Sequence, residues 1–265
     1  MTKTYDLRDL VTGLRALGVQ PGQDLLVHSS MRRVGPVRGG AADVLDALRI
    51  ATAGATIVVP THTASNSLSS RAFLAATAGM STAQRGRHVA AMPGFDPEKT
   101  PSHGMGALAE HVRTIVGAQR SSHPQTSFAA FGPRAERYTA GHELTCHLGE
   151  SSPLGGLYQA GSAVLLLGVG YAACTALHLA EYRLPGCRRR RYQCFTVSEG
   201  VRRDCEFIDA DLIDSDFEAV GGLLDRESFV RRGQVAAADC RLLPIRAIVD
   251  FTAGCQSFRR YRATA

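Results

Sequence analysis

Residues 163–183 read AVLLLGVGYAACTALHLAEYR, and this stretch decides how the rest of the chain is interpreted. An apolar run that ends at Gly168 and Gly170 is typical of a buried strand followed by a turn. The helix expected after the turn carries His178 and Glu181 three positions apart, so both side chains lie on one helix face. Open α/β sheets place their chemistry at the carboxyl ends of strands. The stretch therefore predicts a histidine–carboxylate pair beside such a strand end.

A carboxylate next to an imidazole sets the tautomer of the ring and stabilises its charged form, which prepares the histidine to act as a general base. A purely structural ion pair is the alternative, and the spacing alone leaves both open. The uncharged run 163–180 is also long enough to raise the question of a transmembrane span. Its glycines and polar residues favour a buried strand and a helix instead, so no membrane association is predicted.

Two other classes of function can be drawn from neighbouring residues. The run GVGYAA at 168–173 matches the dinucleotide-binding fingerprint with alanine in last place, and the arginines at 188–191 could meet the 2′-phosphate of NADP. The next strand, however, is expected to begin near Tyr192, so the arginines would precede it. The same arginines resemble a nucleic-acid patch, but no recognisable binding motif accompanies them. An NADP-binding oxidoreductase stays an alternative, and no nucleic-acid partner is expected.

The composition describes one ordinary globule. With 265 residues, 45% hydrophobic and 20% charged, the chain can bury a sizeable core, and we expect a single domain over residues 1–265. None of the seven cysteines forms a Cys-x-x-Cys pair and none of the nine histidines has metal-ligand spacing, so no metal ion is predicted. Residues 1–20 read as an amphipathic helix without a signal sequence, which predicts a cytoplasmic location.

The order of elements predicts the fold class. We expect strands at 24–28, 55–60, 126–132 and 163–169, and helices at 41–51, 69–77, 106–116, 134–140 and 174–182. Strands that alternate with helices favour an α/β fold with a mostly parallel central sheet covered on both faces. Past residue 189 we expect a hairpin (192–199, 201–208), a helix (215–224), a strand pair near 228–240 and a helix (244–254). These elements predict an antiparallel C-terminal extension.

Two loops and one acidic run are candidate binding regions. The loop 28–35 offers hydroxyls, backbone amides and two arginines that suit phosphate groups, although an ordinary βα loop would look the same. In the proline-rich loop 91–106, Asp96 could bind a cation or cap a turn. Residues 204–218 hold seven acids and no base. Such a run is either a solvated face or a means of drawing a polycationic ligand into a cleft.

Five stretches, taken together and in order, carry a resemblance to a known family. They are LVHSSM (26–31), FDP with TPS (95–102), RSSHPQTSFAA (120–130), GESSPLG (149–155) and TALHLAE (175–181). Over about residues 5–255 the chain resembles the aminoglycoside 3-N-acetyltransferases. The resemblance implies a three-layer α/β/α sandwich and transfer of acetyl from acetyl-CoA to the 3-amino group of a 2-deoxystreptamine ring. A different amine acceptor, such as a biosynthetic intermediate, stays possible.

The resemblance also implies roles for individual residues. His178 corresponds to the family's general base, Glu181 to the acid of the same motif, and Thr175 to a candidate oxyanion donor. The residues expected to bind the coenzyme are Ser29, Ser30, Met31, Arg32, Arg33, Val34 and Gly35, together with the turn Ser122, His123 and Pro124. On grounds of charge, the ammonium groups of the antibiotic are expected at Asp96, Asp209 and Asp216.

The expected mechanism is direct transfer without an acetyl-enzyme, in a monomer or homodimer. Aminoglycoside amines are largely protonated at neutral pH, so a base must expose the nitrogen lone pair, and histidine with a reference pKa of about 6.5 suits that task. Relatives commonly have asparagine before the threonine of the HLAE helix, whereas this chain has Cys174. A thiol nucleophile four residues from His178 is one interpretation and a small buried core residue is the other.

Overall fold

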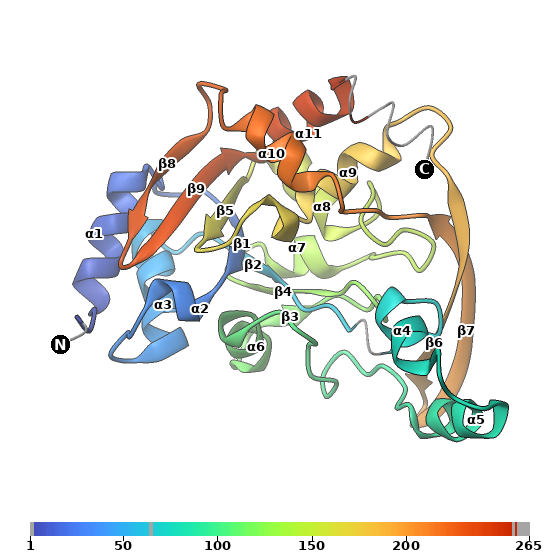
Figure 1. The fold of residues 1–265 in the computed structure, drawn as a ribbon. Coiled ribbons are helices and arrows are strands. Elements are labelled where there is room, and N and C mark those ends of the chain that lie inside the picture. The colour runs from blue at the N-terminus through green and yellow to red at the C-terminus, as the bar shows by residue number, and fades with distance from the viewer. Residues whose placement is uncertain (1–2, 64–65, 256–257, 259–265) are drawn as a thin grey trace.

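The computed structural model describes residues 3–63, 66–255 and 258. A seven-stranded sheet forms the centre of this part of the chain (Figure 1). The strands lie in the order β3-β4-β2-β1-β5-β9-β8. Their bounds are Leu25–Ser29 for β1, Ile57–Pro60 for β2, Gln119–Arg120 for β3, Phe128–Phe131 for β4, Ala163–Leu167 for β5, Arg231–Val235 for β8 and Ala238–Pro244 for β9.

The centre of this sheet is parallel and its flanks are antiparallel. Strand β1 pairs in parallel with β2 and β5, β4 runs antiparallel to β2 and to β3, and β9 runs antiparallel to β5 and to β8. Strand β4 is reversed because the chain leaves β2 at Pro60 and returns at Phe128 beside it, at the same edge of the sheet. Five of the seven strands that form this sheet in the described chain still run in one direction. The predicted sheet with an antiparallel C-terminal extension is confirmed.

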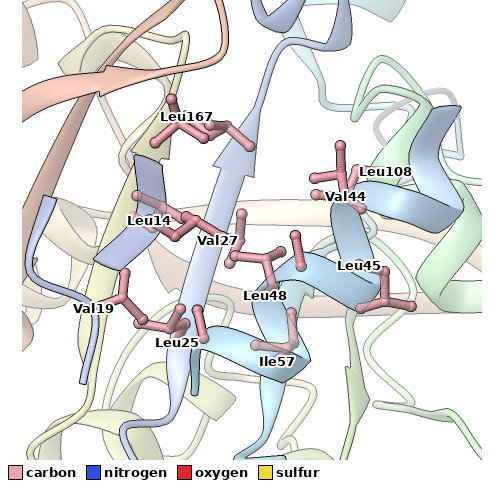
Figure 2. Packing of buried hydrophobic residues seen from close by; sticks show 14 of the residues in the cluster. Leu14, Val19, Leu25, Val27, Val44, Leu45, Leu48, Ile57, Leu108 and Leu167 are labelled. Carbon is pink, nitrogen blue, oxygen red and sulfur yellow. The ribbon is translucent and has the colours of Figure 1, made fainter. Parts of the chain in front are cut away.

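Alternate side chains of each strand enter two separate cores, as the period of two along a strand requires. Leu25 and Val27 of β1 pack on one face with Leu14 and Leu48 (Figure 2). The helices on that face are α1 (Leu7–Leu17), α3 (Gly40–Ala51) and α6 (Ala107–Thr114). Leu26 faces the opposite core, which is covered by α7 (Ala135–Thr139), α8 (Pro153–Ala160), α9 (Ala176–Tyr182), α10 (Phe217–Leu224) and α11 (Ile245–Gly254). Burial of each leucine or valine side chain stabilises the fold by about 1.5–3 kcal/mol. With helices packed on both faces of the sheet, the architecture is the expected α/β/α sandwich.

Helix α1 shows how the sequence sets the ends of an element. Asp6 and Asp9 form a capping box, in which each side chain accepts a hydrogen bond from the backbone N–H of the other residue. At the other end Gly18 adopts φ 103°, a left-handed conformation that costs glycine little. The predicted amphipathic helix within residues 1–20 is confirmed over residues 7–17.

A separate hairpin of β6 (Arg189–Ser198) and β7 (Val201–Ala210) lies beyond α9, with α4 (Arg71–Thr77) and α5 (Thr82–Ala91) beside it (Figure 1). Its two-residue turn, Glu199 and Gly200, has positive φ at both positions, as tight hairpins prefer. The hairpin was predicted, but its expected start near Tyr192 was wrong. Charged residues can begin this strand because they pair across the ribbon, as Arg191 does with Glu206 (2.7 Å).

Some short helices were not anticipated. They are α2 (Met31–Val34), a 3₁₀ turn η1 (Tyr171–Ala173), α5 and α8. Two of them carry start signals in the sequence: Ser81 and Gln84 form a capping box before α5, and Ser152 caps α8 ahead of Pro153. None of the helices in the described ranges combines the length and hydropathy needed to cross a membrane.

Candidate active site

A cavity of about 540 Å³ opens where β1, β2 and β5 end. Ser29 and Pro60 are the last residues of β1 and β2, Val169 follows β5, and all three line the cavity. The facing wall comes from α9 and from the hairpin, through Arg190 and Tyr192. The cavity therefore lies at the carboxyl edge of the parallel strands, where α/β sheets carry their sites.

Helix α9 presents His178 to this cavity, with the buried Glu181 one turn further along the same helix. Nδ1–H of His178 donates to Oε1 of Glu181 at 3.0 Å, and the Glu181 side chain is only 2% exposed. Because a carboxylate only accepts hydrogen bonds, this contact selects the tautomer of the neutral ring that has its proton on Nδ1 and its lone pair on Nε2. The Phe217 ring lies 4.6 Å from the His178 ring and restricts its rotation. The arrangement is that of an oriented base with one nitrogen available.

Thr175 stands at the start of α9 and also lines the cavity. Its hydroxyl lies 3.3 Å from Nε2 of His28, a buried residue of β1. Burial lowers the pKa of His28 to about 3, so this ring is neutral at neutral pH. The Thr175 hydroxyl therefore contacts a neutral imidazole and not an imidazolium. His28 adds no positive charge to this part of the cavity.

The sharp turn after β5 makes room for these groups. Gly168 has φ 71°, and a Cβ placed there would come within 2.7 Å of the Cβ of Arg33. Glycine is therefore required both by the backbone conformation and by the close approach of the loop after β1. This geometry explains Gly168 without a dinucleotide. The strand after α9 is β6 of the separate hairpin, so this place lacks the βαβ unit that the fingerprint requires.

Two further histidines reach the cavity. His62 follows β2, packs edge-on against Phe128 (5.3 Å between ring centroids) and keeps Nε2 buried without a hydrogen-bond partner in the described chain. Burial lowers its pKa to about 3, helped by the other histidines around it. His147 donates Nδ1–H to Oδ2 of Asp209 (2.6 Å), and a second hydrogen bond (2.7 Å) joins its Nε2 to Gln125. The part of the cavity wall formed by His62 and His147 is thus polar, and burial favours the neutral form of both imidazole rings.

The residues expected to bind the coenzyme fall into two groups. In the loop after β1, Ser29 lines the cavity, Met31–Val34 form the one-turn helix α2, and Arg32 and Arg33 are exposed. In the second group Ser122 is exposed, while His123 and Pro124 are buried behind the cavity. The cavity lining begins directly after them, with Gln125 and Thr126.

The acids expected to bind substrate are dispersed. Asp96 caps its own turn, accepting from the backbone N–H of Glu98 (2.9 Å) and pairing with Lys99 (3.5 Å). Asp209 is 1% exposed and lies behind His147. Asp216 directly precedes α10 and does not line the cavity. The acid of this run that does line the cavity is Asp214.

Cys174 is fully buried in the core beneath α9, and burial raises the pKa of its thiol to about 12. A protonated thiol outside the cavity is a packing residue, which favours the second interpretation of this position. Within the described ranges, no three His, Cys, Asp or Glu side chains are arranged to hold a metal ion.

His178, held by the buried carboxylate of Glu181, faces a cavity at the strand ends of an α/β/α sandwich, and this arrangement suits acid–base chemistry. Residues 26–256 match the model of the aminoglycoside 3-N-acetyltransferase family, and the chain belongs to that family. It is 34% identical over 248 residues to the SPbeta prophage-derived aminoglycoside N(3′)-acetyltransferase-like protein YokD of Bacillus subtilis, covering 92% of this chain and 89% of that protein.

Solved structures give the same result. The crystal structure of YokD superposes with a TM-score of 0.87 at 32% identity, covering 96% of this chain and 94% of that one. AAC-IIIb in a binary complex with CoASH gives 0.82 at 27% identity, with coverage of 95% and 96%. AAC-VIa bound to sisomicin gives 0.79 at 32% identity, with coverage of 94% and 96%. The expected family and fold are confirmed.

Several residues that line the cavity were not assigned to the site individually from the sequence, although the candidate regions 28–35, 188–191 and 204–218 contain three of them. They are His28, His62, His147, Arg190, Tyr192 and Asp214. His28 had a usable signal, because alternation along β1 places it on the same face as Leu26, toward α9. The others lie on loops or on the hairpin, and only the tertiary fold brings them to the strand ends.

Proposed function

We propose that the protein transfers the acetyl group of acetyl-CoA to the 3-amino group of a 2-deoxystreptamine aminoglycoside, with His178 as general base. The observation that carries this proposal is that His178 lines the cavity while the buried Glu181 binds its Nδ1. Relatives of the same fold bind the free coenzyme, CoASH, in AAC-IIIb and sisomicin in AAC-VIa. The enzyme would act in the cytoplasm, as a monomer or homodimer.

The transfer needs a base because an ammonium group has no lone pair. In the proposed step, Nε2 of His178 takes one proton from the acceptor, and the exposed nitrogen attacks the acetyl carbonyl carbon. The C–N bond forms as the C–S bond breaks. The imidazolium returns its proton to the departing thiolate, and the acylated nitrogen loses one of its two protons to solvent, which leaves a neutral amide. Glu181 holds the ring and stabilises its charged form, a contribution typical of general-base catalysis worth about 10²- to 10⁴-fold.

Charge develops on the acetyl oxygen during the attack, and the site offers neutral donors for it. The Thr175 hydroxyl is one, fixed at the start of α9 and within 3.3 Å of His28. Donors that are oriented before the reaction stabilise such an oxyanion most effectively. No covalent intermediate is required, because the acceptor nitrogen reaches the thioester directly.

The loop after β1 supports the coenzyme side of the proposal. Arg32 and Arg33 are exposed at α2, which begins two residues after the cavity-lining Ser29, and form no ion pair within the described chain. Guanidinium groups in this position suit the phosphates of coenzyme A. Ser122, His123 and Pro124 would support the same region indirectly, since Gln125 and Thr126 carry the adjacent wall.

The test is mass spectrometry of gentamicin, kanamycin and apramycin after incubation with acetyl-CoA and purified protein. The proposal expects one added acetyl group, located by NMR on the 3-nitrogen, together with release of the coenzyme thiol. A product acetylated at another amine would show that the proposed position of transfer is wrong, while the protein would still be an acetyl-CoA-dependent N-acetyltransferase. Unmodified antibiotics together with tight NADP binding would instead favour the oxidoreductase alternative.

A further inference from the structure

We infer that Cys194 and Cys205 form a reversible disulfide across the β6–β7 hairpin, with a small-molecule disulfide such as glutathione disulfide as the oxidant. Both residues are free thiols in the structure. The proposed acetyl transfer uses neither of them. Their oxidation is a reaction of the hairpin and does not depend on the chemistry in the cavity.

The two cysteines face each other in the strand register. Cys194 of β6 is the direct partner of Cys205 of β7, and among the paired strands of the described chain no other register joins two cysteines. Directly opposite residues of an antiparallel pair have Cα atoms about 4.5–5.5 Å apart, and disulfides join Cα atoms about 4.4–6.8 Å apart. The ribbon therefore holds the two residues at a distance that a disulfide can bridge without a change in the backbone.

The two thiols already contact each other. The Cys194 thiol donates a hydrogen bond to the sulfur of Cys205. Burial raises the pKa of both thiols, and this hydrogen bond adds to the rise at Cys194 while it opposes the rise at Cys205. Because the side chains point toward each other, an S–S bond of about 2 Å needs rotation of the side chains and no shift of the strands.

The two thiols differ in exposure, and this difference sets the order of the steps. Cys205 is half-buried, whereas Cys194 is 1% exposed. The Cys205 thiolate attacks glutathione disulfide, which forms a mixed disulfide and releases one glutathione. The Cys194 thiolate then attacks the sulfur of Cys205, which forms the S–S bond and releases the second glutathione. The two cysteines lose two electrons and two protons, and both end on the two glutathione thiols.

The disulfide fastens the face of the hairpin that contributes to the cavity wall. Side chains alternate along β6, so Cys194 lies on the same face as Arg190 and Tyr192, which both line the cavity. On β7, Phe207 lies opposite Tyr192 and stacks on its ring, with 5.6 Å between the ring centroids. A bond between Cys194 and Cys205 adds a covalent link to the next pair of this row and restricts the motion of the wall.

The test is incubation of the folded protein with excess glutathione disulfide, followed by blocking of free thiols and mass spectrometry of the peptides without reductant. We expect two peptides joined through Cys194 and Cys205, and recovery of both thiols with dithiothreitol. The buried thiols of Cys174 and Cys240 should stay free and serve as internal controls. The absence of this crosslink, its formation only in urea, or a bond from either cysteine to a different residue overturns the inference.

Two variants separate the steps of the reaction. In Cys194→Ser the exchange should stop at the mixed disulfide, so that glutathione stays on Cys205. In Cys205→Ser, a change at a half-buried position that keeps the test available if the first variant fails to fold, Cys194 should take up no glutathione. Glutathione that remains on Cys205 in the wild type would show that Cys194 does not complete the exchange, and this result also overturns the inference.

The effect on the hairpin is measured on the oxidised and the reduced wild type. Closing a short loop lowers the entropy of the unfolded chain, so oxidation should raise the melting temperature by at least about 3 °C. Hydrogen exchange of the backbone amides in residues 189–193 should become slower. The same treatment of Cys205→Ser should change neither quantity. An unchanged or lower melting temperature, or unchanged exchange, would contradict a link that fits the native ribbon and restricts the cavity wall.

Discussion

Oδ2 of Asp209 lies 2.6 Å from Nδ1 of His147 and accepts the Tyr182 hydroxyl at 2.7 Å. Burial by itself raises the pKa of Asp209, but the hydrogen bonds from His147 and Tyr182 outweigh it and lower the pKa. One buried carboxylate thus ties β7 and α9 to the loop that carries His147 into the cavity wall.

Replacing this carboxylate should affect stability before it affects binding. Asp209→Asn removes the charge while its partners stay buried, and we expect a loss of about 3 kcal/mol in the free energy of unfolding. Urea denaturation measures it, with the exposed Asp204→Asn of the same strand as the control that changes little. Full stability combined with a raised KM for the acceptor would support the substrate-binding role suggested by charge alone.

Buried histidines predict a pH dependence of stability. Burial lowers the pKa of His28 to about 3 and that of His142 to about 4, and it lowers the pKa of His123 well below its ordinary value. In the unfolded chain each titrates near pH 6.5, so below that pH the unfolded state binds protons that the folded state refuses. Their stabilising effect is complete above about pH 7 and declines as pH falls.

Each of these histidines should lower the free energy of unfolding by up to about 1.4 kcal/mol for every pH unit below about 5.5. Urea unfolding at a series of pH values between about 7.5 and 5 measures the slope. An unfolding free energy that stays constant over this range would contradict the neutral, buried state assigned to the three rings.

Cys174 offers a test of the covalent alternative. Because its thiol is fully buried and its pKa is raised to about 12, Cys174→Ala should keep kcat within about threefold of the wild type. Mass spectrometry of the protein incubated with acetyl-CoA alone should show no acetyl group on this residue. An acetylated Cys174, or a kcat reduced by orders of magnitude in the alanine variant, would establish a thiol nucleophile.

The sequence was most informative where structure is local. The strand, turn and helix around Gly168 and His178 are encoded within a short segment, and apolar alternation predicts which way the residues of β1 face. The hairpin was also visible, because its two strands are adjacent in the chain. The length of its turn and its first residue could not be predicted. Arginines can start the strand because they form ion pairs across it.

The part of the cavity wall that comes from the hairpin and the segment after it could not be predicted in the same way. Arg190, Asp214 and His62 line one cavity only because of the tertiary fold, and no spacing in the sequence encodes that arrangement. The acidic run misled for a related reason. Seven acids in fifteen positions suggest one charged surface, yet Asp209 is buried against His147 and Asp211 pairs with Arg190.

The measurement that tests the central claim most directly is the turnover of His178→Ala with saturating acetyl-CoA and a good amine acceptor. The account predicts a kcat lowered at least about 10²-fold, with the affinity for coenzyme A, measured by calorimetry, nearly unchanged. A variant that keeps near-normal turnover would show that another group takes the proton and would contradict the role assigned to His178.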